Sequence, residues 1–471
     1  MINKKIFKVI VIGSGPGGSI PAEMISKRGY DVLLIEKGEF RDLNSVKPFS
    51  GEELSKKYKN GGLTMSFGQT NINYVEGSCV GGGSEVNSGL YHRLPDEVLK
   101  KWEEKNKLTI DKDHLKNAYN TNEEDLSISY LKSNTPKASL KIINGCSKLN
   151  WNCKEVPRWY KYDSNNNGVK QSMTETYIPR FLKNGGYLLE NSTVIKISSS
   201  GKNRNVHVLS KGETTIYSSE YVFMSAGAID SPFLLRKSGY KGLVGKGLKT
   251  HPSFKFTAYF DEEVYSNQDA VAVHQVKEFS PKITMGCSVS NKPYVGIALN
   301  DNERLSEISA WKNMANYYIM ISPEGSGRVS SLPFLDSPFV YHKLTKYDYH
   351  KLNEGIFLLA KLLFESGAKR IYPSCTSFKE FSNLEDVYKL QLANKKDLKL
   401  MTIHLFCSNQ MAGNKKLGPV NPEGCLWEDN SVYVSDGSIL VDSPTVNPQG
   451  IIMALARLNA DVFLNKLQNE F

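Results

Sequence analysis

The chain opens with two short runs of apolar, mostly β-branched residues, separated by a glycine-rich turn. Residues 7–12 (FKVIVI) and 31–35 (DVLLI) form almost uninterrupted apolar runs, which are typical of strands buried in a parallel sheet. Between them, a helix-like run follows the turn and extends to Lys27. Pro21 falls early in that run, where a proline disturbs a helix least. The pattern predicts a strand, a tight turn, a helix and a second strand.

The later segments predict helices around an antiparallel sheet in the middle of the chain. Residues 253–320 alternate in strand fashion with frequent Gly, Pro and Asn, which indicates antiparallel strands. The other predicted elements are helices within 95–125, 352–367 and 449–467, short strands within 187–223 and at 432–434, and a loop at 164–168.

The order of these segments favours a discontinuous domain over two successive ones. We find no internal repeat and no low-complexity linker. The predicted fold class is α/β, with a Rossmann-like nucleotide-binding domain built from separated segments and a substrate domain that contains the antiparallel sheet. The predicted boundaries are 1–95, 181–251 and 399–471 for the first domain, and 96–180 and 252–398 for the second.

Composition indicates an ordinary globular protein. The 471 residues leave room for two substantial domains, and 40% hydrophobic and 23% charged residues are usual values. The apolar runs are too short to cross a bilayer or to form a secretory signal. The seven cysteines are scattered without a C-x-x-C pair, so we expect reduced thiols, no metal site and a cytoplasmic location.

The net charge of +10 does not by itself indicate a nucleic-acid partner. The lysines are spread along the chain and interleaved with acids, as in residues 100–107 (KKWEEKNK). An arginine-rich tract and the usual nucleic-acid-binding signatures are missing from the sequence. We interpret the charge as solvated surface and expect a small-molecule partner.

Three glycines after the first strand form a dinucleotide-binding fingerprint. Gly13, Gly15 and Gly18 give G-x-G-x-x-G between a strand and a helix, which provides a tight turn, close approach to a pyrophosphate and helix–strand packing. Glu36 ends the next strand, where a carboxylate accepts hydrogen bonds from a ribose diol. The fingerprint leaves FAD and NAD open, but Glu36 disfavours NADP because it would repel a ribose phosphate.

Three further segments resemble signatures of the glucose–methanol–choline (GMC) oxidoreductase family. Residues 76–89 (EGSCVGGGSEVNSG) are similar to the family's glycine-rich loop over the flavin, and residues 225–235 (SAGAIDSPFLL) are similar to its second signature. The third segment is C-terminal and contains His404, Met411, Asp436-Gly437-Ser438 and Asn447-Pro448. The resemblance covers essentially the whole chain, and residues 170–172 and 177–179 are similar to those of shorter bacterial members. It implies an FAD-dependent enzyme that oxidises an alcohol to a carbonyl.

The resemblance also implies which residues contact FAD. Besides the fingerprint and Glu36, these are Gly82, Gly83, Asn87, Val194, Ala226, Asp436, Gly437, Pro448 and Gln449. Glycine lets the main chain lie close to a flat ring and present amides to its edge. Some relatives attach FAD through a histidine of the glycine loop; the matching position here is Val86, so we expect non-covalent FAD.

The implied catalytic pair is His404 and Asn447. Histidine suits removal of the hydroxyl proton because its ordinary pKa, about 6.5, lies near working pH. His404 follows the apolar run 400–403, so we expect it to leave the end of a strand. The family has His or Asn at the second position, where an amide supports the developing alkoxide. We also expect Asn447 to cap the last helix, with Pro448 as its first residue.

Other residues near these motifs are less directly tied to catalysis. We expect His92 and His251 not to be catalytic, and His251-Pro252 resembles a structural turn of the family. Cys407-Ser408 and residues 410–412 (QMA) replace the usual Gly-Thr and Arg-Met-Gly. Because of these replacements, three features stay open: the packing beside the flavin, the identity of the substrate and the identity of the electron acceptor.

The predicted substrate region is polar and rich in Tyr, Asn and Lys, which favours a sugar-like or otherwise hydroxylated substrate. An aminoglycoside intermediate of antibiotic biosynthesis is a specific candidate, although the basic net charge counts against a cationic substrate. A hydrophobic or sterol-like alcohol, a hydroxynitrile-lyase-like activity without net redox change, and a purely structural flavoprotein are the alternatives. Oxygen or another carrier would accept the electrons.

Overall fold

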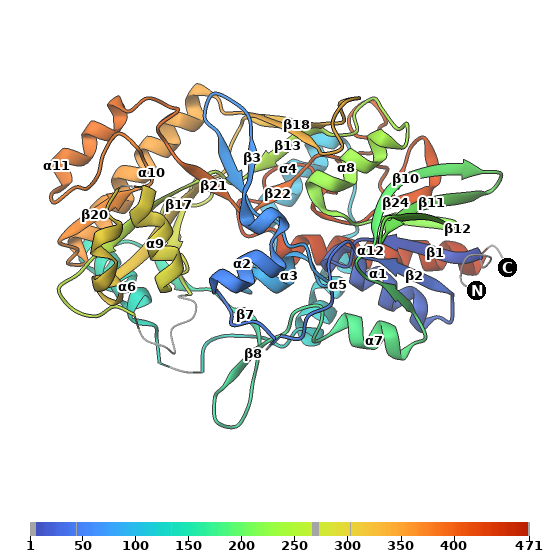
Figure 1. The fold of residues 1–471 in the computed structure, drawn as a ribbon, viewed down its shortest axis with the longest axis horizontal. Coiled ribbons are helices and arrows are strands. Elements are labelled where there is room, and N and C mark those ends of the chain that lie inside the picture. The colour runs from blue at the N-terminus through green and yellow to red at the C-terminus, as the bar shows by residue number, and fades with distance from the viewer. Residues whose placement is uncertain (1–5, 44, 133, 266–272, 302, 470–471) are drawn as a thin grey trace.

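Two large sheets, which lie largely towards opposite ends of the long axis, organise the chain (Figure 1). The computed structural model describes residues 6–469 except 44, 133, 266–272 and 302. Part of the strand pattern predicted within 253–320 therefore lies outside the described residues. The mixed α/β class predicted from the sequence is confirmed.

The first sheet has eight strands around a parallel core. The parallel strands are, in order, β9 (Tyr187–Leu189), β2 (Val32–Ile35), β1 (Ile6–Ile12), β12 (Glu213–Met224) and β24 (Asp429–Val434). Antiparallel pairs extend it from β12 through β11 (Asn203–Ser210) and β10 (Thr193–Ser200), and from β24 through β23 (Cys425–Leu426).

The core of this sheet is apolar on both faces, as its continuous apolar runs predict. Val9 and Val11 of β1 belong to one buried cluster, together with residues of α1 (Pro16–Lys27) and α12 (Gln449–Asn469). Ile10 and Ile12 belong to a second cluster on the opposite face. The predicted strand, turn, helix and second strand at the start of the chain are confirmed.

The second sheet has nine strands and is mostly antiparallel. Its order is β3 (Thr64–Ser66), β4 (Ile72–Tyr74), β21 (Leu400–Thr402), β14 (Ser253–Tyr259), β17 (Met314–Ile321), β16 (Ile283–Cys287), β15 (His274–Val276) and β6 (Cys153–Glu155), with β20 (Arg370–Pro373) also paired to β14. One face is apolar and packs against α10 (Lys346–Glu365) and α6 (Lys137–Leu149). The alternation of each strand therefore directs its polar residues to the other face.

Smaller elements connect the two large sheets. A four-stranded sheet contains β19 (Phe339–Lys343), β18 (Ser326–Ser330), β13 (Lys246–Thr250) and β22 (Leu405–Phe406), and a three-stranded sheet contains β5 (Ile128–Ser129), β7 (Arg158–Tyr162) and β8 (Gly168–Lys170). The other helices are α2 (Gly51–Lys57), α3 (Gly83–Val86), α4 (Asp96–Asn106), α5 (Lys112–Asp125), α7 (Tyr177–Lys183), α8 (Gly227–Lys237), α9 (Lys292–Asp301) and α11 (Leu384–Val387).

The helix α9 contradicts the strand pattern predicted for this part of the chain. Val295, Ile297 and Leu299 occupy alternate positions, which imitates a strand. In the structure Val295 and Leu299 are fully buried, whereas Ile297 is 53% exposed. Residues four apart are buried and the residue between them is exposed, which follows the period of a helix. The alternation of apolar residues at 295, 297 and 299 therefore did not indicate a strand.

The structure leaves the predicted domain boundaries untested. The nine-stranded sheet takes β3, β4 and β21 from stretches that the sequence assigned to the nucleotide-binding domain. None of the helices within the described residues combines the length and apolar character needed to span a membrane.

Candidate active site

The glycine fingerprint forms the turn between β1 and α1. Gly13 has φ +98°, and a side chain there would overlap the carbonyl oxygen of Ser225. A side chain on Gly18 would overlap the carbonyl oxygen of Gly13. Gly15 differs, because no atom lies within 4 Å of the position its Cβ would take. Two glycines thus permit close packing, whereas Gly15 faces open space at the N-terminus of α1, where a pyrophosphate would bind.

Glu36 is buried beside this turn. One of its carboxylate oxygens accepts hydrogen bonds from the Ser14 amide (2.9 Å) and the Ser14 hydroxyl (2.7 Å), and the other accepts one from the Gly38 amide (2.9 Å). The Ser14 hydroxyl in turn accepts a hydrogen bond from the Gly81 amide (3.0 Å). Burial raises the pKa of Glu36, and these hydrogen bonds act in the opposite direction. Ser14, which the sequence reasoning missed, thus links the phosphate turn to the second glycine loop.

The second glycine loop crosses the first one. Gly82 has φ +54°, and its Cβ would lie 3.0 Å from the Cα of Gly15. No atom lies within 4 Å of a Cβ built on Gly83, which begins α3. Asn87 follows α3; its side chain accepts a hydrogen bond from the Gly89 amide (3.0 Å). The structure thus brings Gly82 next to Gly15, while Gly83 faces open space one residue further on.

The second signature joins the C-terminal segment through Asp436. Its carboxylate accepts hydrogen bonds from the Gly227 amide (2.9 Å), the Ser231 hydroxyl and the Ser438 amide (2.8 Å). Ala226 lies at the N-terminus of α8, and its amide donates to the Ser231 hydroxyl (2.9 Å). Gly437 follows Asp436 in a short 3₁₀ turn. Two motifs that are far apart in the sequence therefore meet at the carboxyl ends of β12 and β24.

The remaining predicted cofactor residues lie at the edges of this region. Val194 is half-buried on β10, next to an irregularity in its pairing with β11. α12 begins at Gln449, one residue later than expected, and the Pro448 carbonyl accepts the Ile452 amide (3.1 Å). This one-residue difference corrects the prediction that Pro448 is the first helical residue.

The predicted catalytic residues lie side by side. The Asn447 amide nitrogen is 3.3 Å from Nε2 of His404. His404 follows β21, as expected, and its amide donates to the Thr402 hydroxyl (3.1 Å). The Asn447 side chain bonds to His404 and Gln275. No capping contact of this side chain with α12 is recorded among the described residues.

A chain of hydrogen bonds fixes the orientation of both groups. The Asn447 carbonyl oxygen accepts from the Gln275 amide (3.3 Å), which directs the Asn447 NH₂ to Nε2 of His404. Nε2 is then an acceptor without a proton, so the His404 proton is on Nδ1. That nitrogen lies 3.0 Å from Nδ1 of His251, whose Nε2 lies 2.8 Å from the Ser443 hydroxyl. The network thus assigns His404 the tautomer in which Nε2 carries no proton and accepts the Asn447 amide.

His251 is brought to His404 by strand register. β13 and β22 pair antiparallel with Thr250 opposite Leu405, so the next residues, His251 and His404, also face each other. The two rings meet edge-on at a centroid distance of 5.1 Å. The sequence indicated only a structural turn at His251. The pairing of β13 with β22, which the sequence did not reveal, makes His251 the hydrogen-bond partner of His404.

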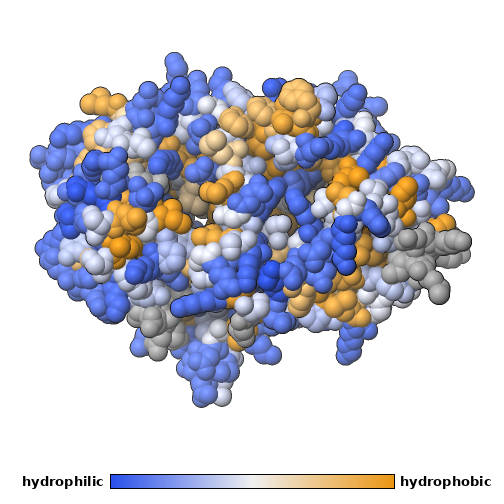
Figure 2. Space-filling model, viewed as in Figure 1, coloured by the Kyte–Doolittle hydropathy of each residue, from blue (hydrophilic) through white to orange (hydrophobic). Residues whose placement is uncertain are grey.

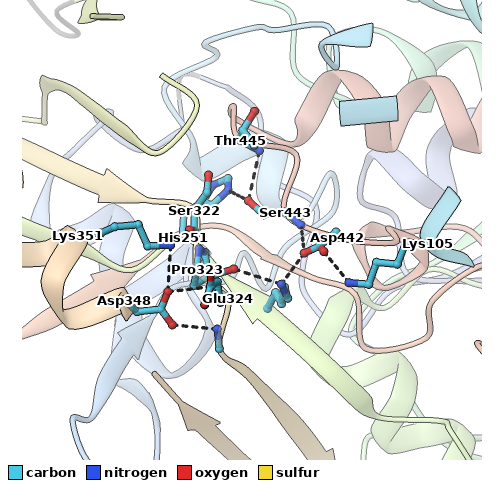
Figure 3. Close-up of polar contacts among 12 residues, drawn as sticks. Lys105, His251, Ser322, Pro323, Glu324, Asp348, Lys351, Asp442, Ser443 and Thr445 are labelled. Atoms are coloured by element: carbon cyan, nitrogen blue, oxygen red, sulfur yellow. Dashed lines mark hydrogen bonds and ion pairs between the residues drawn. The ribbon is translucent and has the colours of Figure 1, made fainter. Parts of the chain in front are cut away.

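Ion pairs of Asp442 with two lysines hold the segment that precedes Asn447. Lys105 and Lys249 both contact the Asp442 carboxylate at 2.5 Å, and Ser443, next in the chain, meets His251 (Figure 3). Lys249 precedes His251 by two residues, and Lys105 belongs to α4. These contacts from two elements hold the Ser443 hydroxyl in place against the His251 ring.

Burial keeps both imidazoles neutral. It lowers the pKa of His404 to about 4. It also lowers the pKa of His251 well below its usual value, with smaller contributions from the positive charges of His404 and Lys249. The sequence reasoning placed the pKa of the base near 6.5, whereas the structure indicates a lower value because His404 is only 9% exposed. At neutral pH the pair carries no charge, and Nε2 of His404 can accept a proton.

Cys407 occupies a backbone conformation that favours glycine. Its φ is +72° and its side chain is fully buried. The resemblance places a glycine at this position, so the chain keeps the backbone turn while changing the residue. For a residue with a Cβ, this conformation costs about 1–2 kcal/mol.

The described residues fit a dinucleotide. The open side of Gly15, the buried carboxylate of Glu36 and the crossing loop at Gly82 lie together at the carboxyl end of β1. The histidine–amide pair lies close to the N-terminus of α12. The fold and this arrangement define a dinucleotide-dependent oxidoreductase.

The comparisons with known proteins identify the family. Models of the GMC oxidoreductase family match residues 55–253 and 325–456. An uncharacterised GMC-type oxidoreductase, y4nJ of Sinorhizobium fredii, is 32% identical over 98% of this chain and 95% of its own length. The chain belongs to the GMC oxidoreductase family, whose members bind FAD and act on CH–OH groups.

More distant relatives agree with this assignment. Long-chain-alcohol oxidase FAO4A of Arabidopsis thaliana is 24% identical over 95% of this chain and 67% of its own length. Two solved structures share the fold at 14% identity: pyridoxine 4-oxidase from Mesorbium loti (TM-score 0.72, 98% of this chain and 99% of that one) and formate oxidase from Aspergillus oryzae (TM-score 0.76, all of both chains).

Proposed function

We propose that this enzyme oxidises the hydroxyl of a polar small molecule, with His404 as the general base and Asn447 as its amide partner. The observation that carries the proposal is the 3.3 Å contact between the Asn447 NH₂ and Nε2 of His404. A substrate hydroxyl that lies against both groups can donate its proton to Nε2 and accept a hydrogen bond from the amide. The amide then supports the alkoxide as negative charge develops.

Bound FAD supplies the hydride acceptor for the carbon-bound hydrogen. The residues proposed to hold it are those of the two glycine loops, Glu36, Asn87, Val194, Ala226, Asp436, Gly437, Pro448 and Gln449. The protein's own chemical task is to orient the alcohol and remove its proton. The His251–Ser443 contact keeps the proton of His404 on Nδ1, so that Nε2 stays unprotonated.

The polar face of the nine-stranded sheet supports a hydroxylated substrate, because Gln275 of this face bonds directly to Asn447 and also donates to the Tyr318 hydroxyl. An aminoglycoside intermediate, which is cationic, stays one candidate within this class. A hydrophobic alcohol is the second candidate, because several relatives in Arabidopsis thaliana are long-chain-alcohol oxidases.

Several narrower statements belong to the same proposal. We propose non-covalent FAD because Val86 occupies the position of the attaching histidine; acid precipitation should release all flavin into the supernatant. FAD modification is described for the formate oxidase, so this measurement is needed.

Oxygen or another carrier is the proposed electron acceptor. The predicted domain division and the cytoplasmic location are likewise proposals from the sequence.

An anaerobic screen of alcohols, sugars and aminosugars tests the function. A substrate should bleach the yellow flavin, and readmitted air shows whether oxygen restores the colour. A lyase-type activity would leave the flavin oxidised.

His404→Ala should slow bleaching about 10²–10⁴-fold while FAD stays bound, since this is the usual contribution of a general base. His350→Ala, in α10, is the matched control. Unchanged bleaching by the His404 variant would exclude it as the base.

A further inference from the structure

Three lysines lie on the face of the nine-stranded sheet that meets the catalytic pair. Pairing across five strands gives one row: Lys154 on β6, Gln275 on β15, Gly286 on β16, Tyr318 on β17 and Lys255 on β14. Residues opposite each other in antiparallel strands point to the same face. Lys154 and Lys255 therefore share the face of Gln275, which bonds to Asn447.

Contacts along the row tie it to the site. The Gln275 amide donates to the Tyr318 hydroxyl (2.9 Å) as well as to Asn447. Tyr318 reaches across Gly286, where a Cβ would lie 2.8 Å from the tyrosine hydroxyl. Lys277 joins from just beyond β15, because its ammonium donates to the Gln275 carbonyl oxygen (2.6 Å). One unbroken set of contacts thus runs from Lys277 through Gln275 to Asn447 and His404.

These lysines have no acidic partner within the part of the chain that the structure describes. Lys255 is half-buried, and neither a hydrogen bond nor an ion pair is recorded for its ammonium there. The recorded partners of Lys277 are neutral: Gln275, and His92 at 3.4 Å. Burial lowers the pKa of Lys255 and of Lys277 to about 8, and the nearby charge of Lys154 adds to the effect at Lys277.

An unpaired ammonium in such a place is costly for the folded protein. Buried charges are ordinarily paired, because the ion loses its hydration without a compensating contact. Two other buried lysines form ion pairs: Lys249 contacts Asp442, and Lys351 contacts Asp348 at 3.1 Å. The lysines beside the catalytic pair differ from these, and a bound anion would supply the missing partner.

We propose that the alcohol oxidised by this enzyme carries an oxyanion, a carboxylate or a phosphate, which Lys255 and Lys277 bind on the sheet face beside Asn447. Exposed Lys154 at the edge of the same face attracts the anion from solution. Ammonium groups accept both oxyanions because they act as point charges without a fixed bidentate geometry. Figure 2 shows the surface hollowed near its centre, between the halves of the molecule. This inference rests on the proposed alcohol oxidation and narrows its substrate class.

Matched pairs of alcohols test the proposal. We would measure anaerobic flavin reduction by 4-hydroxybutanoate against butane-1,4-diol, and by glycerol 3-phosphate against glycerol. The anionic member of at least one pair should have a KM about 10- to 100-fold lower, as charged hydrogen bonds provide. Butanoate and inorganic phosphate, which lack the reacting hydroxyl, should perturb the spectrum of the bound flavin and so report binding without turnover.

Lys255→Met is the sharpest variant, because Lys255 has no recorded contact with the catalytic network. It should raise KM for the anionic substrate and the Kd for the matching anion about 10- to 100-fold, with little change for the neutral alcohol. Lys277→Met should raise the same KM and Kd, but it also removes the hydrogen bond to the Gln275 carbonyl oxygen, so turnover of the neutral alcohol should fall as well. Lys202→Met, at an exposed turn, removes the same charge as a control and should have no effect. Because methionine replaces an unpaired ammonium, the thermal midpoint of Lys255→Met should not fall.

The outcomes separate this inference from the proposed function. Equal KM values within both pairs, or an unchanged KM and Kd in Lys255→Met, overturn the oxyanion proposal. A preference for aminosugars or long-chain alcohols overturns it as well. These results leave the role of His404 intact, whereas undiminished flavin reduction by His404→Ala overturns the proposed function whatever the anion preference.

Discussion

Replacing His251 with phenylalanine tests whether a second imidazole keeps His404, the proposed base, in the tautomer with an unprotonated Nε2. His251 is 1% exposed and meets the ring of Phe406 edge-on at 4.9 Å, so an aromatic ring can remain in the same place. Phenylalanine removes the acceptor for the Nδ1 proton of His404. His404 then has either an unsatisfied buried N–H or its proton on Nε2, where it blocks catalysis.

The size of the effect follows from the cost of the lost hydrogen bond. A buried donor without a partner costs about 1–3 kcal/mol. At 1.4 kcal/mol per factor of ten, the ratio of the His404 tautomer with an unprotonated Nε2 to the other tautomer falls about 5- to 150-fold. The rate constant for anaerobic flavin reduction should fall by up to this factor, whereas KM should change little because the proposed substrate contacts remain.

Stopped-flow reduction of the FAD-loaded variant is the assay. His251→Gln offers a carbonyl oxygen to the same proton and should recover part of the rate. Ser443→Ala, which removes only the far partner of His251, should have a smaller effect than His251→Phe. A yellow His251→Phe protein that reduces its flavin at the wild-type rate would refute the tautomer argument.

Three further predictions concern the cofactor and pH. Gly15→Val should yield a folded protein without yellow colour. The φ of −62° at Gly15 suits any residue, and the valine side chain would fill only the space proposed for the pyrophosphate. Gly51→Val, at another glycine with open space around its Cβ position, is the control and should keep FAD. The rate of flavin reduction should stay flat from pH 7 towards 5 and fall only near pH 4, since burial lowers the pKa of His404 to about 4; a midpoint near 6.5 would contradict this. Burial also lowers the pKa of His342 to about 4, as it does that of His404. Between about pH 6.5 and 4 these two histidines bind protons in the unfolded chain but stay neutral in the folded protein. The free energy of unfolding should therefore decrease as the pH falls through this range. His342→Phe should make this decrease shallower in urea titrations, since within the described residues neither ring nitrogen of His342 has a hydrogen-bond partner.

Much of the cofactor side of the site was predictable because its signals are local. The spacing of Gly13, Gly15 and Gly18 after an apolar strand places a turn at the end of that strand whatever surrounds it. His404 and Asn447 could be paired because each lies in a recognisable motif, and their contact agrees with that pairing. The roles assigned to these residues stay predictions until the variants are measured.

Other features depend on contacts that no local pattern encodes. His251 meets His404 because two short strands, β13 and β22, pair in one register, and a shift of one residue would turn the side chain to the opposite face. In the region of α9, the alternating Val295, Ile297 and Leu299 suggested a strand, and packing of two of them made it a helix.

The sequence by itself determined the order of strands and helices at the chain start, the glycine turn after β1 and the family to which the chain belongs, because short motifs are enough to define each. Only the tertiary structure decided which imidazole contacts His404 and which amide contacts Asn447. It also placed Lys154 and Lys255, distant in sequence, on one face beside the site. Such arrangements arise from register across strands, and register depends on the packing of the whole sheet.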